Sequence, residues 1–166
     1  MTRVFVLDDH DVVRRGLKEL LEDSSDIEVV GEAGTAVEAR SGIPLAEPDV
    51  AVLDVRLSDG SGVEVCREIC SLHPEIKCVM LSAFDDEVSI VESILAGASG
   101  YVLKQIKGGD IVNAVRMVAS GESLFEPALR VRVLDDAART STARRARRAS
   151  LAPANVTPPG RTRTEH

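Results

Sequence analysis

The 166-residue sequence is poor in aromatic residues, in cysteine and in long apolar runs. Aromatic residues make up 2% of the chain, with Tyr101 as the single tyrosine, so we do not expect nucleic-acid bases to stack on this protein. No apolar run approaches the ~20 residues that span a bilayer, and residues 1–9 lack the long apolar stretch of a signal peptide. Three cysteines suggest reduced thiols without disulfides. We therefore expect a cytoplasmic protein with no membrane partner.

Charge is unevenly distributed along the chain. The net charge is −7, yet residues 137–166 contain seven Arg against one acidic residue, Glu165. The rest of the chain is therefore strongly acidic, which argues against a phosphate-coated surface ligand and favours the binding of a cation. The C-terminal segment has few large apolar residues and is rich in Arg, Ser, Thr, Pro and Ala, a composition that does not fold alone.

This composition predicts three parts of the chain. Residues 1–121 have the length and apolar content of one domain, and residues 122–138 form a linker in which Pro127 opens a short helix to about Leu134. We expect residues 139–166 to be disordered. Three interpretations of this Arg-rich tail remain open: an arm for a phosphate backbone or membrane surface, an unstructured linker, or the product of a shifted reading frame.

Short apolar runs rich in β-branched residues alternate with segments of helical periodicity. Because the runs are continuous, they are typical of strands that are covered on both faces; they comprise residues 4–7, 27–30, 50–53, 78–81 and 101–103. Gly42 and Pro44 should end the helix between the second and third runs after about Arg40. The alternation predicts a doubly wound α/β fold: a five-stranded parallel sheet in the order 2-1-3-4-5, with helices on both faces.

Charged or hydroxyl side chains follow four of these five strands: Asp8 and Asp9, Asp54, Ser82, and Lys104. In the order 2-1-3-4-5 the first and third strands are neighbours, so the three carboxylates should lie about one strand spacing (~4.8 Å) apart. Three carboxylates this close need a counter-charge. Lys104 supplies one positive charge, and Mg²⁺, which prefers carboxylate and water oxygens, supplies two.

Carboxylates, a cation and hydrogen-bond donors together indicate phosphoryl transfer. Asp54 can act as the nucleophile and form an aspartyl phosphate, while the Ser82 hydroxyl and the Lys104 ammonium can donate to the phosphoryl oxygens. The turn after the first strand, LDDHDVV, has no glycine and carries two carboxylates where a pyrophosphate would lie. A dinucleotide site is therefore excluded there.

The stretches VFVLDDHDVVRRGLKELLE, VVGEAG, PDVAVLDVRLSDGSGVEVCREI, VMLSAFDDE and ILAGASGYVLKQIKGG carry these residues in order. Over residues 1 to about 121 the chain resembles the receiver domain of bacterial two-component response regulators, most closely the NarL/FixJ class. The resemblance implies a flavodoxin-like fold, a sensor histidine kinase as partner and a protein that catalyses only its own phosphorylation and dephosphorylation. It also allows a homodimer.

The resemblance also assigns roles to single residues. It implies that Asp54 is the phosphoacceptor and that Mg²⁺ is bound by Asp9, by Asp8, by Asp54 and by the backbone carbonyl of Arg56. Ser82 and Lys104 would contact the phosphoryl group. Ser82 and Tyr101 would be the switch residues. Arg56 and Phe84 would flank the path by which water reaches the aspartyl phosphate and so tune its hydrolysis.

Two other functions are weighed against this interpretation. NarL/FixJ regulators continue into a helix-turn-helix domain, whereas nothing after Gly121 has that pattern, so we expect no sequence-specific DNA binding from this chain alone. The alternative is a DNA-binding transcriptional regulator whose second domain is truncated or frame-shifted. A phosphatase of the haloacid-dehalogenase type needs an acid two residues after its nucleophile, where this chain has Arg56.

Some residues have a simpler structural interpretation. Cys66, Cys70 and His73 share one helical face and could suggest zinc, but the sequence offers no fourth ligand nearby, so core packing of the cysteines is favoured. His10 is expected to be an exposed residue at a helix start. Asp11 is expected to be a first-turn acid that the helix dipole favours.

Overall fold

The computed structural model describes the backbone of residues 1–104 and 108–162, and it contains a five-stranded parallel sheet. The strands of this sheet are β1 (Thr2–Leu7), β2 (Ile27–Ala33), β3 (Val50–Asp54), β6 (Lys77–Ser82) and β7 (Gly100–Leu103). Their order is β2-β1-β3-β6-β7, which confirms the predicted order 2-1-3-4-5 because β6 and β7 are the fourth and fifth strands of the sheet. A separate antiparallel pair is formed by β4 (Arg56–Leu57) and β5 (Gly60–Ser61).

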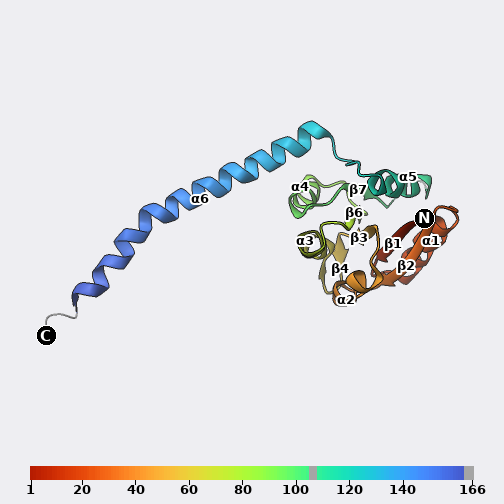
Figure 1. Ribbon diagram of the computed structural model, residues 1–166, viewed down its shortest axis with the longest axis horizontal. Helices are drawn as coiled ribbons and strands as arrows, with labels where there is room; N and C mark the ends of the chain where they lie inside the picture. Colours follow the sequence, from red (N-terminus) through yellow and green to blue (C-terminus); the bar gives the residue numbers. More distant parts are fainter. Residues whose placement is uncertain (105–107, 163–166) are drawn as a thin grey trace.

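Helices cover both faces of the sheet, and a sixth helix extends away from it (Figure 1). They are α1 (Asp11–Glu22), α2 (Ala36–Ala46), α3 (Gly62–Leu72), α4 (Glu87–Ala96), α5 (Gly108–Ala119) and α6 (Pro127–Thr162). Residues of α1 and α5 contribute to one apolar core, and residues of α2, α3 and α4 contribute to a second. The fold is therefore the doubly wound α/β architecture that the sequence predicts.

The two cores explain why the strand sequences are continuous apolar runs. Successive residues of a strand point to opposite faces, so Phe5 and Leu7 enter one core while Val4 and Val6 enter the other. All five residues of β3 are buried. This central strand ends at Asp54, which therefore lies where the buried strand reaches the carboxyl edge of the sheet.

Helix α2 is longer than the sequence predicts. Instead of ending after about Arg40, it continues to Ala46 with Pro44 inside it. The Asp59 carboxylate accepts hydrogen bonds from the first two amides of the helix, and Ala39 and Ile43 are fully buried. Burial of this face outweighs the loss of one backbone hydrogen bond at a proline.

Helix α6 also differs from the expectation. It begins at Pro127, as predicted, but it continues past Leu134 as far as Thr162. The segment expected to be disordered, residues 139–166, is thus helical up to Thr162, and its last four residues lie outside the described part of the chain. Ala and Arg, which are abundant there, are strong helix formers.

The first turns of α6 are attached to the domain. Phe125 and Val133 are buried in the same core as α3 and α4, and Leu129 packs against that core. Within the part of the chain that the structure describes, none of the helices has both the length and the apolar composition needed to cross a bilayer.

Candidate functional site

The strand register brings the predicted site residues to one edge of the sheet. Leu7 of β1 pairs with Leu53 of β3, and Ser82 of β6 pairs with Leu103 of β7. Asp8, Asp54 and Lys104 directly follow paired residues, and Ser82 is itself paired, so these four residues lie side by side. At this edge is a cleft of about 300 Å³, lined by Asp9, His10, Asp54, Arg56, Leu57, Ser58, Ser82, Ala83, Phe84 and Lys104.

Lys104 joins two buried carboxylates at this edge. Its Nζ atom lies 3.0 Å from Oδ2 of Asp8 and 3.0 Å from Oδ2 of Asp54. Asp8 is 0% exposed and Asp54 is 3% exposed. The lysine was predicted as a counter-charge, and its position between both carboxylates matches that prediction.

Burial and mutual contact shift the pKa values of Asp54 and Lys104. The pKa of Asp54 is raised to about 6, because burial and the charge of Asp8, which raise it, outweigh the hydrogen bond from Lys104, which lowers it. For Lys104, burial lowers the pKa, but the two carboxylates outweigh burial and raise the pKa above its usual value. At neutral pH Asp54 is therefore mostly ionised, and Lys104 is charged.

The carboxylates can also hold a cation. Ligand atoms of Asp8, Asp9 and Asp54, together with one from His10, lie within 4.8 Å of one another. Oδ2 of Asp8 and Oδ1 of Asp9 are buried and form no well-aligned hydrogen bond with a described residue; their polar neighbours are Nζ of Lys104 and Nδ1 of His10, each at 3.0 Å. Buried carboxylate oxygens grouped in this way fit a hard cation such as Mg²⁺.

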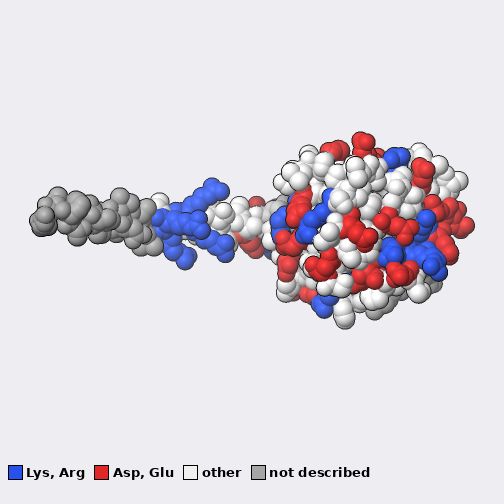
Figure 2. Space-filling model, turned by 90° about the horizontal axis from the view of Figure 1, so that it is seen from below, with Lys and Arg blue, Asp and Glu red and all other residues white. Residues whose placement is uncertain are grey.

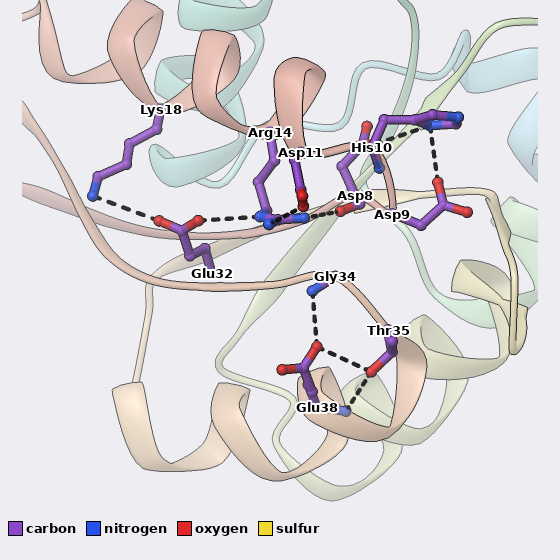
Figure 3. Close-up of polar contacts among 10 residues, drawn as sticks. All are labelled: Asp8, Asp9, His10, Asp11, Arg14, Lys18, Glu32, Gly34, Thr35 and Glu38. Atoms are coloured by element: carbon purple, nitrogen blue, oxygen red, sulfur yellow. Dashed lines mark hydrogen bonds and ion pairs between the residues drawn. The ribbon is translucent and has the colours of Figure 1, made fainter.

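His10 contacts the acid pair (Figure 3). Its side chain is 69% exposed at the start of α1, as expected, but its Nδ1 atom lies 3.0 Å from Oδ1 of Asp9 and 3.5 Å from Oδ1 of Asp8. Its backbone amide donates to Oδ1 of Asp8 at 2.9 Å. These contacts of His10 could not be predicted from its position at a helix start.

Arg14 supports the loop after β1 and was missed by the sequence analysis. Figure 3 shows its guanidinium among three acceptors: the Asp8 carbonyl at 2.6 Å, the Asp11 carboxylate at 2.7 Å and Glu32 at 3.1 Å. Asp11 is thus an ion-pair partner as well as a first-turn acid. The three-residue spacing between Asp11 and Arg14 is the signal that could have indicated the pair.

Ser82 and Tyr101 share one acceptor, the backbone carbonyl of Phe84. The Ser82 hydroxyl donates to this carbonyl at 3.1 Å and accepts from the Phe84 amide at 3.1 Å. The Tyr101 hydroxyl donates to the same carbonyl at 2.8 Å. The two residues predicted as switch residues are therefore linked through the loop that follows β6.

The side chains of Arg56 and Phe84 form the rim of the cleft. The Arg56 guanidinium lies 4.6 Å from the centre of the Phe84 ring, a cation–π contact, and 3.8 Å from Asp86. Phe84 is 53% exposed and is one of the residues that line the cleft. The two residues predicted to tune hydrolysis thus contact each other.

Gly62 is a further residue that the sequence analysis did not single out. It begins α3 directly beside the end of β3, and its amide donates to the Val55 carbonyl at 2.9 Å. A Cβ atom at this position would lie 1.8 Å from the Asp54 carbonyl oxygen. Only glycine allows α3 to pack this close to the strand that carries Asp54.

The fold and the cleft define a doubly wound α/β domain with a buried carboxylate–lysine group at the carboxyl edge of its sheet. Residues 4–116 match the response regulator receiver domain family. The chain therefore belongs to this family of two-component signalling proteins.

Several relatives support this placement. The chain is 50% identical over 126 residues to the DNA-binding transcriptional activator DevR/DosR of Mycobacterium tuberculosis, a match that covers 76% of this chain and 58% of the relative. It is 37% identical over 131 residues to the response regulator protein VraR of Staphylococcus aureus, covering 79% and 63% of the two chains. The chain thus spans about three fifths of the length of these curated relatives.

A solved structure shows the same fold. The signal receiver domain of the putative response regulator NarL from Mycobacterium tuberculosis matches with a TM-score of 0.70 and 34% identity. The match covers 73% of this chain and 98% of that domain. The similarity is therefore to a whole receiver domain.

Proposed function

We propose that Asp54 accepts a phosphoryl group from a phosphohistidine of a sensor histidine kinase and that the phosphorylated domain presents a changed interaction surface. The observation that carries this proposal is the position of Asp54: a carboxylate at the end of the central strand, 3% exposed, in a cleft with Lys104 at 3.0 Å. Membership of the receiver family supports it.

In the proposed reaction a carboxylate oxygen of Asp54 attacks the phosphorus atom of the phosphohistidine. The new O–P bond forms as the P–N bond breaks, and the imidazole nitrogen keeps the electron pair of that bond. Lys104 donates to the phosphoryl oxygens and offsets their charge, and the Ser82 hydroxyl is the second donor. The product is an aspartyl phosphate, which water later hydrolyses.

Mg²⁺ is the proposed cofactor, bound by Asp9 and Asp8, by an oxygen of Asp54 and by the backbone carbonyl of Arg56. When bound, it offsets the negative charge of the carboxylates and of the phosphoryl oxygens. The close grouping of the ligand atoms of Asp8, Asp9 and Asp54 supports this ligand set. The Nδ1 atom of His10 lies 3.0 Å from Oδ1 of Asp9, at the edge of this ligand set.

The proposed switch follows from the shared acceptor at Phe84. When Ser82 turns to the phosphoryl group, its hydrogen bonds to the Phe84 amide and carbonyl are lost. The loop after β6 then loses its anchor at Ser82, and Tyr101, which donates to the same carbonyl, moves with it. The change is transmitted to α4 and β7, which flank this loop.

We also propose roles for the two parts of the chain, the receiver domain and the Arg-rich part of α6. Residues 1–121 are the receiver, a cytoplasmic domain that can form a homodimer, and its enzymatic chemistry is confined to its own phosphorylation and dephosphorylation. The Arg-rich part of α6 forms a blue stretch on the part of the helix that projects from the domain (Figure 2). Its charge supports weak electrostatic binding of polyanions and no reading of DNA sequence.

Phosphorylation with a small-molecule donor tests the proposal without a kinase. The chain is incubated with acetyl phosphate and Mg²⁺, and its intact mass is measured. We expect a gain of one phosphoryl group, which is lost in Asp54→Asn and after chelation of Mg²⁺. The matched control Asp23→Asn, an exposed position at the end of α1, should be labelled like the natural sequence. Equal labelling of Asp54→Asn would overturn the assignment.

A further inference from the structure

Three cysteine thiols lie together outside the phosphorylation site. Cys66 and Cys70 are one turn apart on α3, and Cys78 reaches them from the first half of β6. The Sγ atom of Cys70 lies 3.8 Å from that of Cys66 and 3.8 Å from that of Cys78. All three sulfur atoms are within 4.8 Å of one another.

This spacing fits a shared metal ion. An ion about 2.3 Å from each of three sulfur atoms, and in their plane, holds these atoms about 4.0 Å apart. The two sulfur–sulfur distances of 3.8 Å are close to this separation. Cys66 and Cys78 are 0% exposed, whereas Cys70 is half-buried, so an ion can reach the cluster past Cys70.

The ligand set selects the kind of ion. Among the described residues, no His, Asp or Glu joins the three cysteines in this cluster, and His73, which shares their helical face, is not part of it. Structural zinc sites use four protein ligands, whereas Cu(I) is a soft ion that favours sulfur and is satisfied by three ligands. We propose that Cys66, Cys70 and Cys78 form a site that binds one Cu(I) ion.

The free thiols are already held in position. Cys66 donates a weak hydrogen bond to the Ala96 carbonyl at 3.9 Å, and Cys70 donates to the Gly97 carbonyl at 3.5 Å. Gly97 has a φ of 97°, and a Cβ there would lie 3.2 Å from Cβ of Cys70, so glycine keeps the end of α4 close to the cluster.

Binding forms three Cu–S bonds and leaves the oxidation state of copper unchanged. Thiol protons that are displaced pass to the solvent, and the hydrogen bonds to the end of α4 are exchanged for bonds to the ion. The bound ion joins α3 to β6 and should stabilise the folded chain, because the unfolded chain does not hold the three thiols together. Packing of three cysteines as small apolar residues is the competing explanation, and it predicts no such binding.

The test is a competition for Cu(I) under anaerobic, reducing conditions. The full chain is titrated into a complex of Cu(I) with a chromogenic chelator, and the loss of colour gives the amount of copper withdrawn. We expect one Cu(I) per chain and a Cys70→Ser variant whose affinity is lower by more than about 100-fold, beyond the usual cost of changing a group that only supports a ligand.

Two controls keep the result interpretable. His73→Asn should bind Cu(I) like the natural sequence, because His73 is outside the cluster. Cys70→Ser should keep the far-ultraviolet circular dichroism spectrum of the natural sequence, which shows that it folds without relying on the proposed function. Failure of the natural chain to withdraw Cu(I), equal affinity of Cys70→Ser, or binding of Zn²⁺ with no binding of Cu(I) would each overturn the proposal.

Discussion

Replacing Asp54 by asparagine should stabilise the protein in the absence of metal ions at neutral pH. The ordinary aspartate pKa is 3.8, whereas burial first, and then the charge of Asp8, raise the pKa of Asp54 in the folded chain to about 6. The folded state therefore binds this proton more tightly than the unfolded state does. Folding at pH 7 requires a carboxylate to be buried in its unfavourable, charged form, and asparagine removes that charge while it keeps an acceptor for Lys104.

The size of the effect follows from the two pKa values. At pH 7 the shift from 3.8 to about 6 corresponds to a destabilisation of up to about 3 kcal/mol. Because the folded pKa is raised, stability is gained as pH falls through about 6 towards 3.8. The advantage of Asp54→Asn should shrink to about half at pH 5 and to about one fifth at pH 4.

Urea unfolding in a metal chelator at several pH values measures this difference. The control Asp23→Asn, at an exposed residue, should change the unfolding free energy by less than about 0.5 kcal/mol. Saturating Mg²⁺ should reduce the advantage of Asp54→Asn, because the cation favours the ionised carboxylate. An Asp54→Asn variant that is less stable at pH 7, or whose advantage does not depend on pH, would refute the reasoning.

Three further predictions concern the rate of phosphate release, the packing of α3 and the binding of DNA. Phe84→Ala should retain labelling by acetyl phosphate but lose its phosphoryl group several-fold faster, because the apolar ring lines the cleft beside Arg56 and its loss admits water; an unchanged rate of phosphate release would show that it does not exclude water. Gly62→Ala should lower the melting temperature and the labelling together, since its methyl group would meet the Asp54 carbonyl, and a normal melting curve would contradict this. The chain should bind DNA weakly and without sequence preference, so a footprint that survives about physiological salt would show a missed DNA-reading element.

The sheet and the main site residues could be predicted because their signals are local in the sequence. Continuous apolar runs identify strands that are buried on both faces, and polar residues directly after them must lie at the carboxyl edge. Asp54 and Lys104 are 50 residues apart, yet this rule alone places both at one edge, where the structure finds them 3.0 Å apart.

Other features depend on contacts that the sequence does not encode locally. The Phe84 carbonyl joins Ser82 to Tyr101 only because of the path of the loop after β6. Cys78 joins Cys66 and Cys70 only because α3 packs over the first half of β6. Helix α2 continues past the point predicted for its end because burial of Ile43 against the sheet outweighs the local effect of Pro44.

Chemical mapping of the phosphorylated residue tests the central claim most directly. Sodium borohydride reduces an aspartyl phosphate to homoserine, which peptide sequencing by mass spectrometry locates in the chain. The account predicts that, after treatment with acetyl phosphate and Mg²⁺, homoserine replaces Asp54 and no other aspartate. Homoserine at Asp8 or Asp9, or a phosphorylated chain with an unchanged Asp54, would contradict it.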